Sequence, residues 1–339
     1  MLILFLIIAL LGLSYVLSRS TDWLVAGIEQ VSKGTAIQSY GITTLIVALA
    51  TSLPELFVVV TSALGNSGDL PLGVILGSNI ANITLIIGGA ALISGVVRAN
   101  DELFWRDVLY AFLIGSMPLL LLLDNELSRF DGAVLIVIYI IFSIISLSGK
   151  EKKTIKSVEK KYYEPTGLRH RILHLVGRKD IEQGMLRLTL GSAGLIVASN
   201  LIVRLANTLA IELSAPIILV GLFMISVGTS LPELAFEIKT VRKREYMMAF
   251  GNIVGSTVVN SSLVLGLGAF IRPFRLNGDT NVYYVSVIAF VVAFWLFWGL
   301  TRSEKALHRW EGAVLVGVYF IFLIAQIFVS CSFPVFGCS

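Results

Sequence analysis

Two glutamates stand inside apolar stretches of the chain, each at the end of the same five-residue motif. The sequence Thr-Ser-Leu-Pro-Glu begins at Thr51 and again at Thr229, 178 residues later, and ends at Glu55 and Glu233. An ionised side chain near the centre of a bilayer costs at least ~3 kcal/mol on insertion scales, so such acids usually pair with other groups or line an ion path. Two of them, each beside hydroxyl side chains and a helix-breaking proline, predict a site that holds a cation.

A second motif follows each copy of the first at the same offset. Both copies have two glycines four residues apart, then a serine and an asparagine: Gly73, Gly77, Ser78 and Asn82, and Gly251, Gly255, Ser256 and Asn260. The glycine spacing lets helices pack backbone to backbone, and a serine and an asparagine four residues apart share one helix face. Because buried polar groups need partners, the motif predicts ion binding combined with close packing. Packing alone is the simpler alternative.

The prolines predict a break in each motif-bearing helix. Pro54 has no N–H to donate and clashes with the carbonyl of Ala50, four residues earlier, and Pro232 repeats this arrangement. Carbonyls freed inside a membrane must find partners, and a bound cation can be one. Carboxylates, hydroxyls and carbonyls together make an all-oxygen site. Such a site suits a hard cation such as Ca²⁺ or Na⁺ and not zinc or copper.

Composition identifies the chain as an integral membrane protein. Its 339 residues are 56% hydrophobic and 14% charged, with a mean hydropathy of +0.87, whereas soluble domains carry about 25% charged residues. Apolar runs long enough to cross a hydrocarbon core of roughly 30 Å as helices predict ten transmembrane helices. They lie near residues 2–18, 39–64, 71–96, 103–123, 130–148, 185–210, 215–240, 247–271, 281–301 and 310–330.

The distribution of Lys and Arg predicts the orientation in a cell (inner) membrane. If the segment after the fifth helix is cytoplasmic, most basic residues lie on that side, and Arg129, Arg204, Arg272 and Arg275 lie opposite. This bias is the one that membrane insertion favours, so both termini should face outward. The first helix lacks a basic segment before it, which favours a retained anchor over a cleaved signal peptide. The net charge of +4 reflects the same bias and gives no reason to expect nucleic acid as a partner.

The duplication extends over both halves of the chain. The sequence from Arg129 in the fifth predicted helix matches that from Arg309 in the tenth, and Tyr139 matches Tyr319. Because each half has five helices, the second half must be inserted upside down relative to the first. Duplication kept for assembly alone would explain the symmetry but not the paired acids. The predicted fold is an all-α membrane protein of ten helices in two inverted-topology five-helix repeats, residues 1–148 and 182–330.

The segment between the halves, residues 149–181, is rich in Lys and Arg and predicts a cytoplasmic linker. Its stretch from Leu168 to Val176 has one basic and one apolar face, which fits a helix lying along anionic lipid headgroups. His170 and His174 have the spacing of a metal pair. With no third ligand nearby, a role at the surface is favoured.

A short tail, residues 331–339, follows the last predicted helix and lies on the predicted outer face. It holds both cysteines of the chain, Cys331 and Cys338. An external disulfide and two free thiols are both compatible with the sequence.

The paired motifs resemble the two α-repeats of the sodium/calcium exchangers, which belong to the Ca²⁺:cation antiporter superfamily. Ala-Thr-Ser-Leu-Pro-Glu at 50–55 and Gly-Thr-Ser-Leu-Pro-Glu at 228–233 are each followed by Gly-Ser-x-x-x-Asn, and the repeats would span 41–90 and 219–268. The resemblance covers nearly the whole chain outside the linker. It implies the ten-helix exchanger fold and a secondary active antiporter, not an enzyme, that exchanges Na⁺ for Ca²⁺ without a cofactor and works as a monomer.

The resemblance also implies roles for the motif residues. Glu55 and Glu233 would be the central Ca²⁺ ligands, joined by Thr51 and Thr229. Surrounding groups would help to form Na⁺ sites: Ser52, Ser78, Asn82, Ser230, Ser256 and Asn260, with carbonyls near Ala48 and Ser226. In this family Na⁺ and Ca²⁺ compete for one set of ligands, and the first and sixth helices slide over a more fixed core.

Two departures from the family pattern bear on the coupling ion. Asn260 stands where some members, including K⁺-dependent exchangers, have Asp, which argues against a K⁺ site. Proton-coupled relatives usually carry a Gly-Asn-Ala-x-Glu core that is absent here, so Na⁺ coupling is favoured over a Ca²⁺/H⁺ exchanger. A cation channel is a more distant alternative. The predicted membrane segments offer no Ser–His or Cys–His arrangement for an intramembrane hydrolase.

One further acid, Glu237, lies a helical turn beyond Glu233. We interpret it as a charge partner of Lys239 or Arg242 near a helix end. A position in a vestibule that attracts cations is the alternative.

Overall fold

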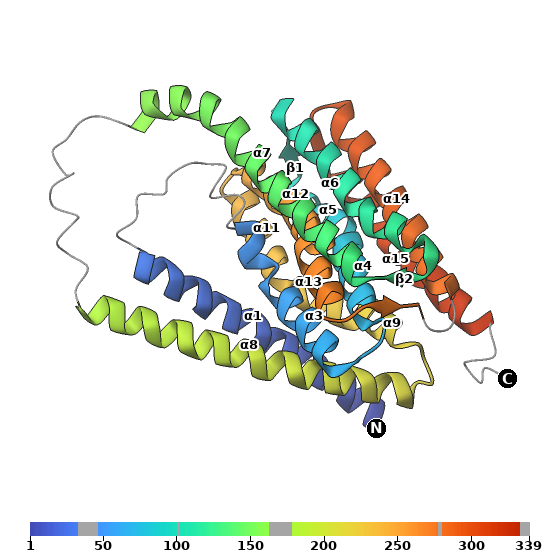
Figure 1. The fold of residues 1–339 in the computed structure, drawn as a ribbon. Helices are drawn as coiled ribbons and strands as arrows, with labels where there is room; N and C mark the ends of the chain where they lie inside the picture. Colours follow the sequence, from blue (N-terminus) through green and yellow to red (C-terminus); the bar gives the residue numbers. More distant parts are fainter. Residues whose placement is uncertain (33–46, 100–101, 163–177, 277–279, 333–339) are drawn as a thin grey trace.

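Helices dominate the computed structural model, which describes residues 1–32, 47–99, 102–162, 178–276 and 280–332 (Figure 1). Within these ranges, eight helical segments are long and apolar enough to span a membrane. They comprise α1 (Leu2–Ser32), α4 to α5 (Leu70–Ala81, η1 at Asn82–Ile86, Ile87–Ser94), α6 (Glu102–Leu121), α7 (Arg129–Tyr162), α8 (Arg178–Glu212), α12 to α13 (Tyr246–Val258, η5 at Val259–Val264, Leu265–Ile271), α14 (Thr280–Ser303) and α15 (Arg309–Ser332).

Two further segments are interrupted helices. A pair bent by 40° runs from α9 (Ile217–Val220) through η4 (Gly221–Ile225) and α10 (Ser226–Thr229) into α11 (Leu231–Arg242). In the first half, residues 47–51 are helical and α3 (Leu53–Gly65) follows after a break. The all-α membrane fold is therefore confirmed. The count of ten spans remains a prediction, because the second predicted helix, 39–64, begins among residues that the structure does not describe.

Three helices are longer than their apolar runs. α1 continues to Ser32, α7 to Tyr162, and α8 begins at Arg178, because a helix need not end where the hydrocarbon core does. The predicted linker, 149–181, is thus partly helical at both ends. α15 continues to Ser332, so Cys331 belongs to that helix rather than to a tail. Cys338, His170, His174 and the stretch 168–176 lie outside the described residues.

Two small strand pairs reveal how the halves are related. β1 (Val96–Arg98) follows α5 and β3 (Phe274–Arg275) follows α13, while β2 (Glu126–Leu127) precedes α7 and β4 (Ala306–His308) precedes α15. β1 pairs with β4 and β2 pairs with β3, both antiparallel. If the two halves of the chain are exchanged, the β1–β4 pair takes the place of the β2–β3 pair. The two strand pairs, called ribbons below, are therefore equivalent. Since the spanning helix α6 separates β1 from β2, the ribbons lie at opposite ends of the molecule (Figure 1), as an inverted repeat requires.

Glycines bring the two halves into backbone contact at two equivalent places. A Cβ on Gly88 of α5 would lie 2.8 Å from the carbonyl oxygen of Gly312 in α15, and a Cβ on Gly132 of α7 would lie 2.6 Å from that of Gly266 in α13. Such close approach is available only to residues without a side chain, and small residues are the usual means of helix association in a bilayer.

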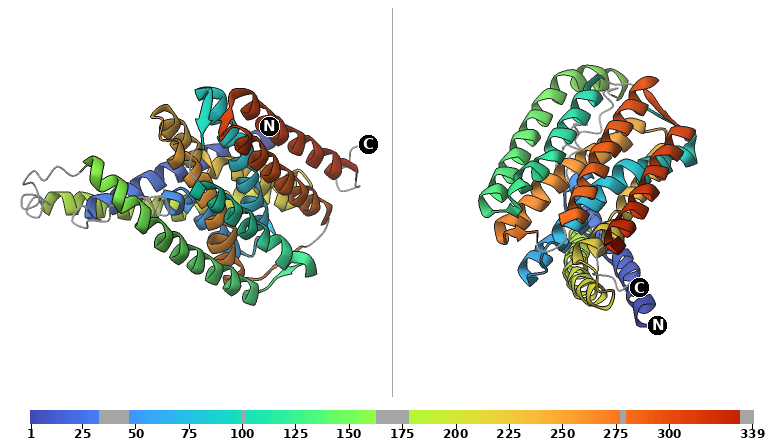
Figure 2. Two further views of the ribbon diagram at one scale, coloured as in Figure 1. Left: turned by 90° about the horizontal axis from the view of Figure 1, so that it is seen from above. Right: turned by 90° about the vertical axis from the view of Figure 1, so that its right-hand side faces the viewer.

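Helices α1 and α8 lie side by side and form a layer of their own against the other helices (Figures 1 and 2). Their buried apolar residues, which include Leu10, Leu17, Leu195 and Ile202, form one cluster with parts of α3 and α4. Most other buried apolar residues belong to a second, larger cluster. The molecule therefore has two apolar cores, one under the α1–α8 layer and one in the body.

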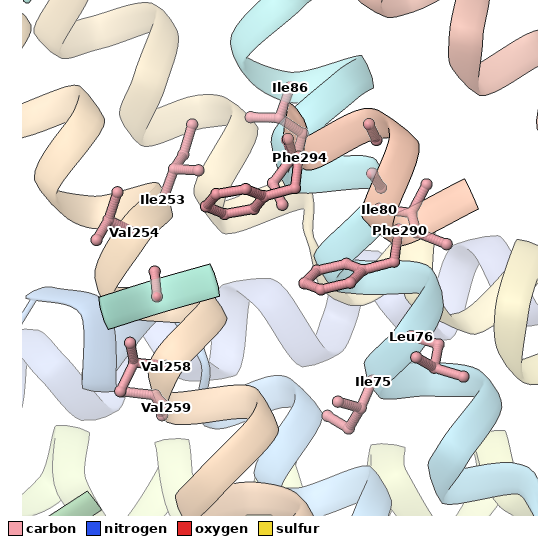
Figure 3. Close-up of a cluster of buried hydrophobic side chains, with 14 of the residues drawn as sticks. Ile75, Leu76, Ile80, Ile86, Ile253, Val254, Val258, Val259, Phe290 and Phe294 are labelled. Atoms are coloured by element: carbon pink, nitrogen blue, oxygen red, sulfur yellow. The ribbon is translucent and has the colours of Figure 1, made fainter. Parts of the chain in front are cut away.

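The larger cluster surrounds the second motif of each half. Residues of α4 and η1 such as Ile75 and Ile80 face residues of α12 such as Ile253 and Val258, and the rings of Phe290 and Phe294 extend from α14 toward α12 (Figure 3). These side chains are almost fully buried, so α4 and α12 are fixed within the body. Their polar residues are held in place by this packing.

The outer faces carry exposed large apolar side chains, as the surface of a membrane protein does. They include Phe5 and Ile8 of α1, Ile144 of α7, Trp295 of α14 and Phe328 of α15. Soluble monomers rarely expose contiguous apolar patches of this kind. This exposure agrees with the multi-pass membrane fold.

Replacing Gly88 with alanine should lower thermal stability, because its Cβ would lie 2.8 Å from a backbone oxygen that only a helix shift can relieve. Overpacking of this kind costs about 1–3 kcal/mol. A Cβ on the neighbouring Gly89 would meet open space, so Gly89→Ala provides the matched control. The measurement is the melting temperature of each variant in detergent. An equal response of Gly88→Ala and Gly89→Ala would contradict the proposed contact.

Candidate cation site

Both motif-bearing helices break at the serine of the motif. Ser52 and Ser230 have matching non-helical backbone angles, φ −82° and ψ 3° and φ −82° and ψ 9°. A new helix starts directly after each, with its proline in the first turn, where a missing N–H costs nothing. Glu55 and Glu233 therefore lie in the first turns of α3 and α11, where unsatisfied N–H groups and the helix dipole favour negative charge.

The carbonyls predicted near the break already have partners. The Ala48 oxygen accepts hydrogen bonds from the Ser52 N–H at 3.1 Å and from the Thr51 hydroxyl at 3.3 Å. The Ser226 oxygen accepts the equivalent bonds from Ser230 and Thr229, at 3.0 and 3.2 Å. A cation bound to either carbonyl would thus compete with a threonine hydroxyl.

The Glu55 carboxylate is fully buried and only half satisfied. Its Oε1 accepts hydrogen bonds from Ser78 Oγ at 3.2 Å and from Ser230 Oγ at 3.4 Å. Its Oε2 has no hydrogen-bond partner, and none of the residue is exposed. Ser78 belongs to the first half and Ser230 to the second, so both halves hold this one carboxylate.

The Glu233 carboxylate is also fully buried, and neither of its oxygens has a hydrogen-bond partner. It lies close enough to Glu55 for the two charges to repel each other. Each acid also lies near the threonine of the opposite half, Glu55 near Thr229 and Glu233 near Thr51. The structure thus brings the four predicted Ca²⁺ ligands together.

Buried oxygens without partners are concentrated in the predicted ligand set. Besides the two carboxylates, they include Ser52 Oγ, Asn82 Oδ1 and Asn260 Oδ1. An unpaired buried polar atom costs about 1–3 kcal/mol, so a group of them needs a ligand to complete it. Asn82 and Asn260 each lie at the start of a wider, π-helical turn, η1 and η5. Turns of this kind are frequent at functional sites.

The two serines of the second motif have different partners. Ser78 bonds to Glu55, whereas Ser256 Oγ lies 3.2 Å from Thr51 Oγ1, across the boundary between the halves. Thr51 Oγ1 also lies 3.1 Å from Asn252 Oδ1, and its one hydroxyl proton is shared between this oxygen and that of Ala48. The hydrogen bonds around the site are therefore less symmetric than the sequence.

Glycines of the second motif set the distance between the halves at the site. A Cβ on Gly77 of α4 would lie 2.3 Å from the Leu222 oxygen and 2.6 Å from Ser226 Oγ, and one on Gly255 of α12 would lie 2.6 Å from the Ala48 Cβ. The glycines thus provide packing. Ser78, one position after Gly77, donates to the Glu55 carboxylate, whereas Ser256, one position after Gly255, contacts Thr51. Close packing therefore occurs directly beside the predicted ligands.

Asn79 is a site neighbour that the sequence analysis missed. Its Nδ2 donates to Ser261 Oγ at 2.7 Å, and its Oδ1 accepts from Asn260 Nδ2 at 3.4 Å. It fixes the amide of Asn260 so that Oδ1 stays unpaired. A buried amide in an otherwise apolar run, next to a motif serine, is the signal that identifies such a residue.

The interpretation of Glu237 as a charge partner of Lys239 or Arg242 is wrong. Glu237 is fully buried, and Oε1 accepts a hydrogen bond from Asn252 Nδ2 at 3.1 Å. Lys239 and Arg242 instead line cavities on other sides of the helix. The sequence spacing was misleading because residues two and five positions away on a helix do not share the face of Glu237.

A cavity of about 500 Å³ reaches the site from one end of the molecule. It is lined by α1 residues such as Ser18, Thr21 and Asp22, by Thr51, and by α11 residues such as Pro232 and Lys239. The C-terminal ends of α1 and α11 and the start of α8 lie toward the end where α7 leads into the linker (Figure 1), called the linker end below. Thr51 is thus the site residue that this cavity exposes.

Comparison with known proteins agrees with this geometry. The sequence profile described as Sodium/calcium exchanger protein matches residues 2–148 and 184–328. The chain belongs to the sodium/calcium exchanger family. Membership of this family makes it a membrane antiporter for Ca²⁺ and another cation.

Two relatives and one solved structure illustrate the similarity. Inner membrane protein YrbG of Escherichia coli (strain K12) is 30% identical over 316 residues, which cover 92% of this chain and 93% of YrbG. Sodium/calcium exchanger MaX1 of Methanosarcina acetivorans is 24% identical in an alignment 353 positions long, which covers 95% of this chain and 98% of MaX1. The structure of the sodium-calcium exchanger NCX_Mj matches with a TM-score of 0.62 at 22% identity and covers 96% of this chain and 99% of its own. That match shows a shared fold.

The donor set of this exchanger site is two carboxylates plus neutral oxygens. Across the described ranges, no group of three or more His, Cys, Asp or Glu side chains is placed to hold one metal ion. Beside Glu55 and Glu233, the protein groups available to a cation here are therefore hydroxyl, amide and carbonyl oxygens. Hard cations accept such ligands, and Ca²⁺ takes six to eight of them.

Calcium should raise the thermal stability of the purified protein, because it binds the folded site and not the unfolded chain. The gain is about 2.7 kcal/mol when Ca²⁺ is at 100 times its dissociation constant. Glu55→Gln and Glu233→Gln should lose most of this shift in melting temperature. Glu212→Gln, at an exposed glutamate, is the control that should keep it. Full retention of the Ca²⁺ shift by both site variants would contradict the assignment.

Proposed function

We propose that this antiporter exchanges Na⁺ for Ca²⁺ at a single site between Glu55 and Glu233, without a requirement for K⁺. The observation that carries the proposal is the pair of fully buried carboxylates, one from each half, whose oxygens mostly lack protein partners. One Ca²⁺ or more than one Na⁺ neutralises two carboxylates. The hydroxyl and amide oxygens around the pair supply the remaining ligands.

Obligatory exchange follows from the cost of the empty site. Two uncompensated charges in the apolar interior are expensive, so the conformational change that carries the site between the two sides is favoured only when cations are bound. Loading with Ca²⁺ or with Na⁺ then gives exchange rather than leakage. Because one chain supplies both carboxylates, a monomer is sufficient for transport.

In the proposed orientation the linker is cytoplasmic and both termini are outside the cell membrane. Supporting this, Arg98, Arg242 and Arg244 gather around one cavity of about 680 Å³, at the end of the molecule where α11 finishes. Basic residues accumulate on the cytoplasmic side of membrane proteins. With this orientation, the cavity that reaches Thr51 opens to the cytoplasm, and the conformation is inward-facing.

The α1–α8 layer is the proposed moving part. The apolar core beneath it is separate from that of the body, and α1 lines the Thr51 cavity together with α11 and residues 47–51. Displacement of this layer along the body would close the cavity at the linker end and open the opposite one. The body, held by backbone contacts at glycines, would keep the ligands in place.

A sodium gradient should drive Ca²⁺ into proteoliposomes that contain the wild-type protein. Glu55→Gln and Glu233→Gln should each abolish this flux, because a neutral amide leaves one carboxylate to compensate Ca²⁺. Glu212→Gln should transport normally. The measurement is the initial rate of ⁴⁵Ca²⁺ uptake with Na⁺ inside and not outside.

Ion gradients imposed one at a time distinguish Na⁺/Ca²⁺ exchange from a Ca²⁺/H⁺ exchanger and from a channel. Uptake driven by a pH gradient in the absence of Na⁺ would identify a Ca²⁺/H⁺ exchanger. Single-channel currents without coupling to a second ion would identify a channel. Unchanged transport by either glutamine variant would refute the site itself.

Transport should be independent of K⁺, because the amide at Asn260 offers an oxygen ligand without a third charge at that position. Removing K⁺ from both sides should leave the Na⁺-driven rate within about twofold, provided the membrane potential is clamped by another permeant ion. Asn260→Asp introduces the acid that K⁺-dependent exchangers have at this position, and its K⁺ dependence is compared with that of the wild type. A rate that falls to background without K⁺ would contradict the proposal.

A further inference from the structure

A third carboxylate lies buried in the body beside the exchanger site. Glu237 of α11 has no exposed surface, and its Oε2 has no hydrogen-bond partner. Its Oε1 accepts a single bond, from the neutral amide of Asn252 on α12 at 3.1 Å. Among the described residues, no cationic side chain forms an ion pair with it. A carboxylate with one amide donor in an apolar interior is not compensated.

The first half of the chain has no equivalent of this polar pair. The residues 178 positions earlier, which correspond to Glu237 and Asn252 in the first half, are Val59 and Val74. Both valines are fully buried. The same positions are therefore apolar in one half and hold an acid and an amide in the other. The second half thus bears a desolvation cost at these positions that the first half does not.

The pair is connected to the exchanger site through Thr51. Asn252 donates through Nδ2 to Glu237 and accepts through Oδ1 from Thr51 Oγ1 at 3.1 Å. These two bonds fix the amide, because the flipped orientation would place Oδ1 against the carboxylate. Thr51 also lines the cavity from the linker end. Glu237 lies close enough to repel Glu233, yet the three acids do not form one coordination group.

The net charge of the pair selects the class of ligand. Glu237 supplies one negative charge, and Asn252 and Thr51 are neutral. Two charges would match a divalent ion, as at Glu55 and Glu233, whereas one charge with oxygen ligands matches a hard monovalent cation. When Ca²⁺ neutralises the Glu55–Glu233 pair, the charge on Glu237 still needs a partner.

We propose that Glu237, oriented by Asn252, forms a separate Na⁺ subsite on the linker side of the Glu55–Glu233 pair. The identity of the ion rests on the proposed Na⁺/Ca²⁺ exchange. Glu237 is the third negative charge near the site, beside Glu55 and Glu233. Some relatives instead have their third acid at the position of Asn260. The subsite therefore adds a Na⁺ position that remains occupied when Ca²⁺ fills the central pair.

The test is a Na⁺-dependent thermal shift of the intact protein in detergent with Ca²⁺ kept saturating. N-methylglucamine replaces Na⁺ at constant ionic strength. In the wild type, Na⁺ should raise the melting temperature further, because the pair is occupied by Ca²⁺ while Glu237 is free to bind. Competition at the central pair would add almost nothing, because Ca²⁺ already saturates it. Glu237→Gln should lose the Na⁺-dependent rise and keep the Ca²⁺-dependent one.

A double variant, Glu237→Val with Asn252→Val, guards against a simple folding defect, since it copies the valine pair of the first half. It should fold, respond to Ca²⁺ and show no rise with Na⁺. Glu245→Gln, at an exposed glutamate just after the same helix, should respond as the wild type does. A Na⁺-dependent rise of wild-type size in both Glu237 variants would overturn the subsite.

A wild-type response to pH between 6 and 8 with none to Na⁺ would also overturn it, because a proton would then neutralise Glu237. This result is separable from failure of the proposed function. If Na⁺ gradients fail to drive Ca²⁺ uptake by the wild type, the exchange assignment fails, whatever the thermal shifts show.

Discussion

The structure depends on one constraint: carboxylates placed in an apolar interior must have their charge compensated. Glu55, Glu233 and Glu237 have no exposed surface. Glu55 has hydroxyl partners, Glu237 has one amide partner and Glu233 has neither, and in the described ranges none of them has a cationic partner. Helix breaks at Ser52 and Ser230 place the first two acids in the first turns of α3 and α11. In the proposed function, the negative charge that the helix ends do not compensate is balanced by Na⁺ or Ca²⁺. Ion transport then depends on this incomplete compensation, since a fully paired acid would not bind an ion.

The two apolar cores divide the molecule into a body that holds the buried carboxylates and a layer, α1 with α8, that packs against it. The body contacts itself through backbone atoms at Gly88, Gly132 and Gly77, and contacts of this kind tolerate little displacement. The α1–α8 layer meets the body largely through apolar side chains, which lose little when one surface slides along another. In the proposed mechanism, the ligands are attached to the rigid body and the α1–α8 layer controls access to them. A site carried on the sliding layer would change its geometry with every cycle.

Much of this architecture follows from sequence, and the exceptions have physical causes. Hydropathy located the spanning helices and the duplicated motif located the acid pair, because both depend on residue type and spacing along the chain. The predicted spans did not include the polar ends of α1, α7 and α8, since polar helical turns leave no hydropathic signal. The partner of Glu237 was misassigned because Asn252 is on the next helix, and only tertiary packing brings the two together. Asn79 was missed for the same reason, as its partners Ser261 and Asn260 belong to the other half.

The hydrogen bonds at the site carry information that the symmetric sequence does not. Ser78 donates to Glu55, whereas its equivalent Ser256 contacts Thr51 and leaves Glu233 bare. The cavity that reaches the site likewise includes Thr51 and not its equivalent Thr229. In an inverted repeat, access from one side requires the two halves to differ in conformation, and exchanging their conformations produces access from the other side. In the proposed cycle, the asymmetry seen here is one of two arrangements in which the halves exchange roles. In the opposite state Ser256 would donate to Glu233, Ser78 would contact Thr229, and Glu55 would be the bare carboxylate. Glu237 has no counterpart in this exchange, because Val59 takes its place in the first half, so the two states cannot be energetically identical in this chain.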